Sequence, residues 1–366
     1  MSYVIPIGPY HPALEEPVHV KLYTDGEFVD DAKVYIGYNN RGIEKLAQEK
    51  NFIQTITLVE RVCGICSHSH SLAYCLAIEN IAELEVPKRG SYIRVIICEL
   101  ERLHSHFLLL GLAAHIIGFD SAFMYTFSAR EKVMEALETL TGNRVNYAMN
   151  IIGGARRDID KEGLKNLLMI IEELKEPYER LINDERIIDI FGRDKTLALR
   201  TKGVGKLTYD EAWIYGLSGP HGRASGLKCD TRKIDPYCSY EDFNFNMVVQ
   251  KDGDVFSRVL VRLLEIGESI RIITQAAENM PDTPINLGVK IPRVPAGEYC
   301  TRIEAPRGEL TYYVVTDGSQ GNRRVNIHVP TFRNAASVPA MLKGNTVADA
   351  GLIVASIDPC FSCLDR

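Results

Sequence analysis

The hydrophobic pattern of the chain changes twice, which divides it into three regions. Apolar and polar residues alternate with a period of two over residues 18–23 and again over 32–36. Asp25 and Gly26 lie between these runs and form a typical turn signal. Alternation of this kind predicts strands with one buried face, so the first region is predicted to be a β-hairpin or a small antiparallel sheet.

The middle region has the spacing of helices. Short helices are expected after Arg41, before Arg61 and from Cys66 onward, and the charged helix ending near residue 184 should lie on the surface. Over residues 202–240 glycine and proline become frequent, which predicts an irregular connection. Longer helices are predicted over about 92–115, 129–140, 160–184 and 254–279.

The helix predicted over 92–115 is unusual because polar residues interrupt its apolar pattern. Charged side chains are costly to bury unless they are paired. These residues therefore either face solvent or form an internal polar network near the centre of the protein. They are Glu101, Arg102, His104, Ser105 and His106.

The last region returns to a strand pattern, with a glycine-containing turn over residues 317–322 between its last two strands and a short helix over 347–356. The predicted strands cover 286–291, 301–304, 309–316 and 325–329.

This order of elements predicts an α+β fold, with a mainly helical core and small N-terminal and C-terminal antiparallel β regions. We expect residues 1–366 to form a single domain. Within it, residues 1–40 would be the N-terminal β region, 41–285 the helical core, and 286–366 the C-terminal β region and tail.

Composition fits a globular protein outside the membrane. The chain is 46% hydrophobic and 25% charged, a balance that allows a large core, and its net charge of −6 includes no basic block that would bind nucleic acid. The N-terminus lacks the layout of a signal peptide, and no apolar run approaches the roughly 20 residues that span a bilayer. The nine cysteines are therefore expected in a reducing compartment, where thiols stay free or bind metal.

Two cysteine pairs with metal-ligand spacing lie at opposite ends of the chain. Cys63 and Cys66 form the first, and Cys360 and Cys363 form the second. Four thiolates suit zinc, an iron–sulfur cluster, or nickel with iron. The long separation disfavours a local zinc module, and ferredoxin-like cysteine runs are absent. The fold would have to bring both ends of the chain together around one metal site.

The other five cysteines have no partner at this spacing. Free cysteine usually behaves as a small buried hydrophobic residue, and we expect this of Cys75, Cys98, Cys229, Cys238 and Cys300.

Two charged residues add to the candidate site. Glu44 precedes the first cysteine pair, and Arg307 lies between two predicted strands. A metal site that moves protons needs a carboxylate, and anionic ligands on a metal need a cationic partner. The simpler interpretations are a helix-start carboxylate for Glu44 and a turn arginine for Arg307.

Taken together, three motifs resemble the signatures of the large, catalytic subunit of nickel–iron hydrogenases. Two lie near the N-terminus and one at the C-terminus, and the residue types and long spacing match at both ends. The motifs are Arg41-Gly42-x-Glu44, Arg61-x-Cys63-Gly64-x-Cys66-x-x-x-His70 and Asp358-Pro359-Cys360-x-x-Cys363-x-x-Arg366.

Other segments are similar to the quinone-site subunit of respiratory complex I, and energy-converting, membrane-associated hydrogenases share both sets of features. The complex I subunit lacks the cysteine pairs, so their presence favours a hydrogenase of the energy-converting group. His11 is then expected to remain a loop histidine. The segments are Gly8-Pro9-Tyr10-His11-Pro12, Asp25-Gly26-Glu27 and Gly219-Pro220-x-x-Arg223-Ala224-Ser225-Gly226.

The resemblance implies a binuclear nickel–iron centre whose iron carries two cyanides and one carbon monoxide. Cys63 and Cys360 would be terminal ligands of nickel, and Cys66 and Cys363 would bridge nickel and iron. The Cys360 thiolate could act as the base while the metals polarise dihydrogen. The presence of an additional magnesium or iron near Arg366 stays open.

The resemblance also assigns residues around this centre. Arg307 would hydrogen-bond a cyanide, with Pro306 beside it, and Thr331 would contact the other cyanide. Glu44 would pass protons to or from a terminal cysteine. Asp358 and Asp120 would contact residues that bind the metals, and His70 would support the cysteine loop by hydrogen bonding.

The implied reaction is the reversible reduction of protons to dihydrogen, coupled to ferredoxin oxidation and to ion translocation. Electrons would pass through a 4Fe–4S cluster in a hydrogenase small subunit. The further partners would be a ferredoxin-type carrier and ion-translocating membrane subunits, with the chain at the cytoplasmic face of the membrane. The end at Arg366 would then be a processed C-terminus.

Two alternatives remain open at this point. One is a subunit of a soluble, cofactor-reducing hydrogenase, which would bind a flavin-bearing partner. The other is a non-catalytic coupling subunit of the complex I type, in which the cysteines are vestigial or bind structural zinc.

Overall fold

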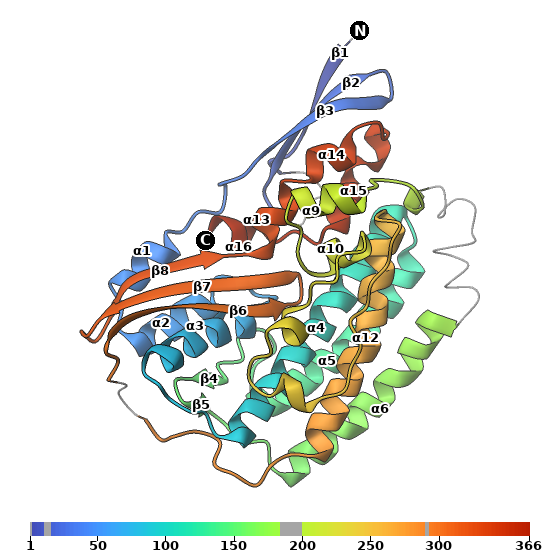
Figure 1. The fold of residues 1–366 in the computed structure, drawn as a ribbon. Helices are drawn as coiled ribbons and strands as arrows, with labels where there is room; N and C mark the ends of the chain where they lie inside the picture. Colours follow the sequence, from blue (N-terminus) through green and yellow to red (C-terminus); the bar gives the residue numbers. More distant parts are fainter. Residues whose placement is uncertain (1, 11–15, 184–199, 290–292) are drawn as a thin grey trace.

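Four long helices pack side by side in the middle of the protein (Figure 1). The computed structural model describes residues 2–10, 16–183, 200–289 and 293–366. The apolar faces of these helices form one hydrophobic cluster, and α4 lies at its centre because it contacts α3, α5, α12 and α15. The four are α4 (Lys88–Ile117), α5 (Asp120–Thr141), α6 (Lys161–Asn183) and α12 (Val255–Glu278).

These helices confirm the predicted helical core, with a different start for α5. It begins at Asp120 and not near residue 129, because Gly118 ends α4 in the left-handed region (φ 91°) and allows an immediate reversal of the chain. The charged helix α6 is largely exposed, as its composition predicts.

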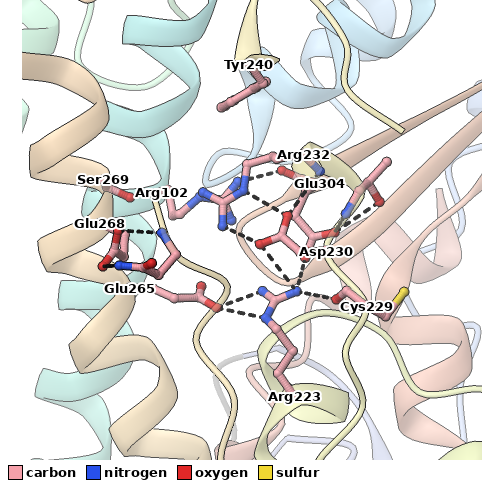
Figure 2. A network of polar contacts seen from close by, with 12 residues as sticks. Arg102, Arg223, Cys229, Asp230, Arg232, Tyr240, Glu265, Glu268, Ser269 and Glu304 are labelled. Carbon is pink, nitrogen blue, oxygen red and sulfur yellow. Dashed lines mark hydrogen bonds and ion pairs between the residues drawn. The ribbon is translucent and has the colours of Figure 1, made fainter. Parts of the chain in front are cut away.

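The polar residues of α4 are buried, which decides between the two alternatives in favour of an internal network (Figure 2). Glu99 accepts hydrogen bonds from the hydroxyls of Tyr240 (2.6 Å) and Ser269 (2.6 Å), and Arg232 Nη1 lies 3.2 Å from its carboxylate. Arg102 adds a second guanidinium, 3.3 Å from Glu99. Glu99 and Arg102 of α4 therefore each have a partner of opposite sign.

A second group of ion pairs continues this network toward the C-terminal sheet. Arg223 lies 2.7 Å from Glu304 and 2.8 Å from Glu265, and Arg232 lies 2.7 Å from Asp230. Figure 2 shows the two guanidinium groups directed at these carboxylates. The pairs link α4 and α12 to β6 and to two short helices, α10 (Gly219–Ala224) and α11 (Thr231–Ile234).

The C-terminal sheet covers one side of the N-terminal helices. Its three strands are antiparallel in the order β6-β7-β8, and residues of β7 alternate between buried and half-exposed because α3 packs on one face. The tight turn from Ala305 to Gly308 holds Pro306 and Arg307 at the end of the β6–β7 hairpin. The strands are β6 (Ala296–Ala305), β7 (Gly308–Asp317) and β8 (Asn322–His328).

The N-terminal sheet has one strand more than the alternation predicts. β1 (Ser2–Ile7) pairs with β2 (His19–Asp25), which pairs with β3 (Phe28–Tyr35). β1 is short and contains Pro6, so it gives no clear alternation. His11 lies outside the described residues.

The strand predicted over 286–291 is wrong where the structure describes it. Residues 286–289 form only a single bridge, between Asn286 and Gly154, because this segment passes the N-terminal end of α4 and packs on a short hairpin. Residues 290 and 291 lie outside the described part of the chain. The hairpin consists of β4 (Asn150–Ile151) and β5 (Gly154–Ala155).

Shorter helices complete the fold. The region over 202–240 is largely irregular, as expected, but contains short helices, and the tail is more helical than predicted. The N-terminal helices are α1 (Ile43–Gln48), α2 (Phe52–Glu60) and α3 (Ser67–Ile81); the others are α9 (Tyr209–Ile214), α13 (Pro330–Ala335), α14 (Val338–Leu342), α15 (Ala350–Ser356), α16 (Phe361–Asp365) and two single 3-10 turns, η1 (Tyr240–Asp242) and η2 (Val347–Asp349).

Both ends of the chain belong to one hydrophobic cluster. Leu22 of β2 and Ile353 of α15 are fully buried in it, and α14 packs against β3. The Val29 amide donates to the Asn345 carbonyl (2.9 Å), which fixes the N-terminal sheet to the tail. In the described part of the chain, none of the helices combines the length and apolar character that crossing a membrane requires.

The network makes a stability prediction. Arg232→Ala would leave Glu99 and Asp230 short of a partner in the interior, and we expect a loss of about 3–5 kcal/mol in the free energy of unfolding. The control is Arg302→Ala, which removes an exposed ion pair with Asp235 and should cost less than about 1 kcal/mol. Urea unfolding curves of both variants measure the difference; equal losses would contradict the assigned role of the network.

Candidate metal centre

Four cysteine sulfurs converge at one buried place between α3 and the tail. Cys63 Sγ lies 3.4 Å from Cys360 Sγ, and Cys66 Sγ lies 3.4 Å from Cys363 Sγ. The sulfurs of Cys360 and Cys363 are 3.0 Å apart. All four residues are at most 5% exposed. The fold therefore unites the two distant pairs, as the sequence required of a single site.

The first pair lies in the turn that leads from α2 into α3. Cys66 is the N-cap residue of α3, and the Ile65 amide donates to Cys63 Sγ (3.2 Å). Gly64 lies where a Cβ atom would come within 3.3 Å of Val145. The side chain of Val145 therefore packs closely against the turn that carries both thiols.

The second pair lies at the start of α16, with Cys360 just before the helix and Cys363 within it. Cys360 is the N-cap residue of α16, and its sulfur accepts a hydrogen bond from the Cys363 amide (3.4 Å). The Cys360 amide donates to Thr331 Oγ1 (3.1 Å). Asp358 adopts a left-handed conformation (φ 58°), which is uncommon outside glycine. This reversal of the chain turns both cysteines toward the first pair.

Arg41 connects the two cysteine turns directly. Its Nη2 donates to the carbonyls of Val62 (2.8 Å) and Ser362 (2.7 Å), and its Nη1 donates to that of Arg61 (3.1 Å). One guanidinium thus holds the residue before Cys63 and the residue before Cys363 at a fixed separation. The motif residue Arg41 carried no assigned role in the sequence.

Arg307 lies beside the thiols and pairs with Asp358. Its Nε donates to the Asp358 carbonyl (2.9 Å), and its Nη2 lies 2.8 Å from the carboxylate. Burial lowers the pKa of Arg307, but Asp358 and the thiolates of Cys360 and Cys63 outweigh it and keep the group charged. Its Nη1 is buried and has no hydrogen-bond partner among the described residues. A charged donor is therefore available for an anionic ligand.

His70 joins the second pair to the C-terminal sheet. Its Nε2 lies 3.3 Å from Cys363 Sγ, and its Nδ1 lies 2.7 Å from the hydroxyl of Tyr312. Burial lowers the pKa of His70 to about 4, so the ring is neutral at physiological pH. A neutral ring can donate one hydrogen bond to a thiolate while it accepts another from the tyrosine.

The thiols differ in how readily they lose a proton. Hydrogen bonds from neighbouring thiols, with Cys360 first, lower the pKa of Cys63 well below its usual range. Burial raises the pKa of Cys363. The four thiols therefore have unequal surroundings, and the hydrogen bonds at Cys63 favour its thiolate.

Glu44 pairs with Arg366. Its Oε1 is 2.9 Å from Arg366 Nε and accepts a hydrogen bond from the Ile327 amide (2.8 Å). Among the described residues its carboxylate makes no hydrogen bond to a cysteine, contrary to the expected contact with a terminal ligand. The carboxylate is held instead by Arg366 and by the backbone of β8.

Asp120 lies outside the site. Its side chain is 74% exposed and pairs with His115, 2.7 Å away, because Asp120 begins α5 at the surface. The structure therefore does not bring Asp120 to the cysteines, contrary to the sequence-based expectation.

The remaining cysteines agree only partly with expectation. Cys75 and Cys98 are buried, as predicted for small hydrophobic residues. Cys229 and Cys238 are half-buried, and Cys300 is exposed because it lies on the outer edge strand β6.

Glu16 is a site residue that sequence reasoning missed. Its Oε2 accepts hydrogen bonds from the amides of Phe361 and Ser362 (3.0 Å to the latter), and its Oε1 accepts one from the Ser362 hydroxyl. Its carboxylate thus lies against the residue that follows Cys360. In the sequence it is one glutamate in a turn-rich segment before Pro17, and no periodicity or motif distinguishes it.

The residues present fit a soft metal centre with anionic ligands. Four sulfurs within contact distance offer thiolates, the donor that nickel, iron and zinc share. The unpartnered Nη1 of Arg307 offers a charged hydrogen bond to a further anion. Buried structural zinc has little need of such a donor, because four thiolates already complete its coordination.

Comparison with protein-family models gives two matches that together cover most of the chain. The model described as respiratory-chain NADH dehydrogenase, 49 kDa subunit, matches residues 117–292 and 285–366. The model described as nickel-dependent hydrogenase matches residues 41–113.

Curated relatives match over the full chain. A carbon monoxide-induced hydrogenase of Rhodospirillum rubrum is 42% identical over 365 residues, which cover 100% of this chain and 99% of the relative. A membrane-bound hydrogenase subunit alpha of Pyrococcus furiosus is 41% identical over 377 residues, 99% of this chain and 87% of the relative.

A solved structure shows the same fold. A chain of the membrane-bound sulfane sulfur reductase, described as an archaeal respiratory membrane complex, aligns with a TM-score of 0.93 and 30% identity over 100% of this chain and 98% of that one. This chain thus belongs to the family that unites the large subunits of nickel-dependent hydrogenases with the 49 kDa subunit of respiratory-chain NADH dehydrogenase.

Proposed function

We propose that this protein is the catalytic subunit of an energy-converting nickel–iron hydrogenase. The observation that carries the proposal is the meeting of four buried thiols with one charged, unpartnered guanidinium donor, Arg307 Nη1. The reaction is the reversible reduction of protons to dihydrogen. The similarity to a carbon monoxide-induced hydrogenase and to a membrane-bound hydrogenase subunit supports this class.

The cysteines would hold the metals. Cys63, Cys66, Cys360 and Cys363 would hold nickel and iron, with Cys63 and Cys360 as ligands of nickel and Cys66 and Cys363 as ligands that both metals would share. When bound, such a centre supplies Lewis acidity and a change of redox state for forming or splitting dihydrogen. Around it, Arg307 donates to an anionic ligand next to Pro306, and Thr331 and Asp358 fix the turn at Cys360.

The protein's own groups would carry the proton. Cys360 offers a sulfur that can hold the proton. The carboxylate of Glu16 accepts hydrogen bonds from the amides of residues 361 and 362, which follow Cys360 directly. We therefore propose Glu16 as the first carboxylate of the proton path. Glu44, the carboxylate expected from the sequence, remains the second candidate, and its pairing with Arg366 favours a structural role.

The residues near Arg366 do not fit an additional magnesium or iron ion. The guanidinium of Arg366 lies 2.9 Å from Glu44, so a fixed positive charge already balances the carboxylate that such a cation would need. We therefore propose that, within the described part of the chain, metal binds at the cysteines and not beside Arg366.

The proposed setting is a complex at the cytoplasmic face of the cell membrane. Electrons would come from a ferredoxin-type carrier through a 4Fe–4S cluster in a small subunit, and membrane subunits would translocate ions. The similarity to subunits named as membrane-bound and respiratory supports this arrangement. The shared hydrophobic cluster of the two chain ends supports a single domain over residues 1–366.

The second candidate is a non-catalytic coupling subunit with structural zinc. The match to the 49 kDa subunit of NADH dehydrogenase over residues 117–366 favours it. Elemental analysis separates the two, since nickel with iron supports the hydrogenase and zinc without nickel supports the coupling subunit.

The metal site makes the first functional prediction. Cys363→Ala removes one bridging sulfur, and we expect the purified complex to lose nearly all its nickel and its dihydrogen–proton exchange. Cys300→Ala, at an exposed thiol, is the matched control and should retain both. Full nickel content in Cys363→Ala would show that the metal binds elsewhere.

The proposed proton path makes the second functional prediction. Glu16→Gln keeps a hydrogen-bonding side chain but cannot take up a proton. The rate of dihydrogen–proton exchange should therefore fall about 100-fold or more, the usual range for a lost acid–base group, with nickel content unchanged. Glu44→Gln should lower exchange by less than about threefold if its role is structural. The reverse order of the two effects would restore Glu44 as the relay and remove Glu16.

A further inference from the structure

Glu101 is a fully buried carboxyl on α4 that lacks a cationic partner. In the described part of the chain no lysine or arginine lies within ion-pair distance of it. Other buried carboxyls of the helical core have one: Glu79 pairs with Arg94 at 2.6 Å, and Glu265 pairs with Arg223 at 2.8 Å. An unbalanced carboxyl in the interior needs a specific explanation.

The contrast is sharpest with Glu99, two residues earlier on the same helix. Burial alone raises the pKa of Glu99, but Arg102 and Arg232 lower it below its usual value. Burial raises the pKa of Glu101 to about 8, against the hydrogen bonds that it accepts. Near neutral pH, Glu99 is therefore ionised and Glu101 is protonated, although they lie on opposite sides of one helix. Such a difference is typical of groups with different roles.

The contacts of Glu101 lead to the cysteine site. Its Oε1 accepts a hydrogen bond from the His68 amide (2.7 Å), and its Oε2 accepts from the amide (3.0 Å) and the hydroxyl (2.5 Å) of Ser69. These residues form the first turn of α3, whose N-cap residue is Cys66. Glu101 thus fixes the turn that carries a proposed bridging ligand without contacting the ligand itself.

The groups that face Glu101 supply no positive charge to balance it. Burial holds the pKa of His68 at about 3, so that ring is neutral and offers no compensation. Arg130 on α5 bonds His104 instead. The hydroxyl of Tyr147 is buried and has no hydrogen-bond partner among the described residues. The remaining titratable neighbours are the thiols of Cys63 and Cys98.

We propose that Glu101 is the charge-balancing residue of the four-cysteine centre, holding a proton when the centre is most negative and releasing it when that charge falls. The proposal rests on the proposed metal centre. An electron delivered by an iron–sulfur protein adds one negative charge, and a proton from solvent forms the O–H bond of Glu101; the bond breaks and the proton returns to solvent when the electron leaves. No other bond changes, so Glu101 is a positioning residue and not a catalytic one.

The metal-free protein tests the carboxyl itself. Its infrared spectrum in H2O and D2O should show the carbonyl stretch of a protonated carboxyl at pH 7, and the band should disappear with a midpoint near pH 8. The pH 8 step should be lost in Glu101→Gln. Glu60→Gln is the control, because Glu60 is also buried but lies 3.5 Å from Arg61, and it should retain the step.

The metal-loaded complex tests the coupling. The carbon monoxide and cyanide stretches of the reduced centre should shift between pH 6 and 10 with a midpoint near 8, and the shift should vanish in Glu101→Gln and persist in Glu60→Gln. A carboxyl step in the metal-free protein with unshifted ligand bands would overturn the proposal, as would the absence of the step. If Glu101→Gln does not fold, Glu101→Asp should move the carboxyl band and its midpoint; an unmoved band overturns the assignment.

The two proposals fail in different ways. Absence of nickel from the unaltered complex would refute the hydrogenase proposal, and the inference on Glu101 with it, although the metal-free titration would still report the carboxyl. Nickel and iron at normal occupancy, with no pH-dependent shift near 8, would refute the inference alone.

Discussion

Guanidinium groups hold the end of the chain inside the protein, and the metal site depends on them. Arg258 donates to the Ser356 hydroxyl (3.0 Å), and Arg262 donates to the carbonyls of Ser356 (3.3 Å) and Ile357 (3.2 Å). Arg307 then holds Asp358. A chain end without such partners would be exposed and mobile, since few contacts restrain it. Here arginine side chains donate to the carbonyls of residues 356, 357 and 358, which restrains the chain just before the second cysteine pair.

These arginines connect the site to the network of Figure 2 through one helix. Arg262 and Glu265 are three residues apart on α12, so they lie on one face. Arg262 points to the tail, whereas Glu265 bonds Arg223 (2.9 Å) and His106 (3.0 Å). Charges of both signs therefore alternate from α4 to the cysteines. The dense pairing makes the interior rigid, which suits a site whose four sulfurs must stay in contact.

Much of this architecture could be predicted from the sequence because it depends on local periodicity. The long helices and the β6–β7–β8 hairpins have patterns of 3.6 and 2 residues, and the cysteine spacing required the two ends to meet. The sequence pattern did not predict β1 or α16, since β1 contains Pro6 and α16 has only five residues. Elements this short are stabilised by tertiary contacts that no local pattern records.

The residues around the sulfurs were harder to predict for the same reason. Arg307 was found because a turn between strands is visible in the sequence, and His70 because it belongs to a motif. Glu16 is bonded to residues 361 and 362, some 345 positions away, so nothing near it in the sequence distinguishes it. Glu44 lies in the expected motif, but its carboxylate pairs with Arg366 of the C-terminal motif, and the residue spacing within each motif does not record a contact between the two.

The arrangement also explains how one scaffold could serve with or without metal. The ion pairs of Arg223 and Arg232 use no sulfur atom, so replacing the cysteines would leave the network of Figure 2 complete. Arg307 likewise keeps Asp358 as its partner. The thiolates add negative charge, and Glu101, a carboxyl outside the network, balances that charge by holding a proton. The scaffold and the chemistry are therefore separable: arginine–carboxylate pairs maintain the fold, and the balance between thiolates and one unpaired carboxyl is left free to change with the state of the centre.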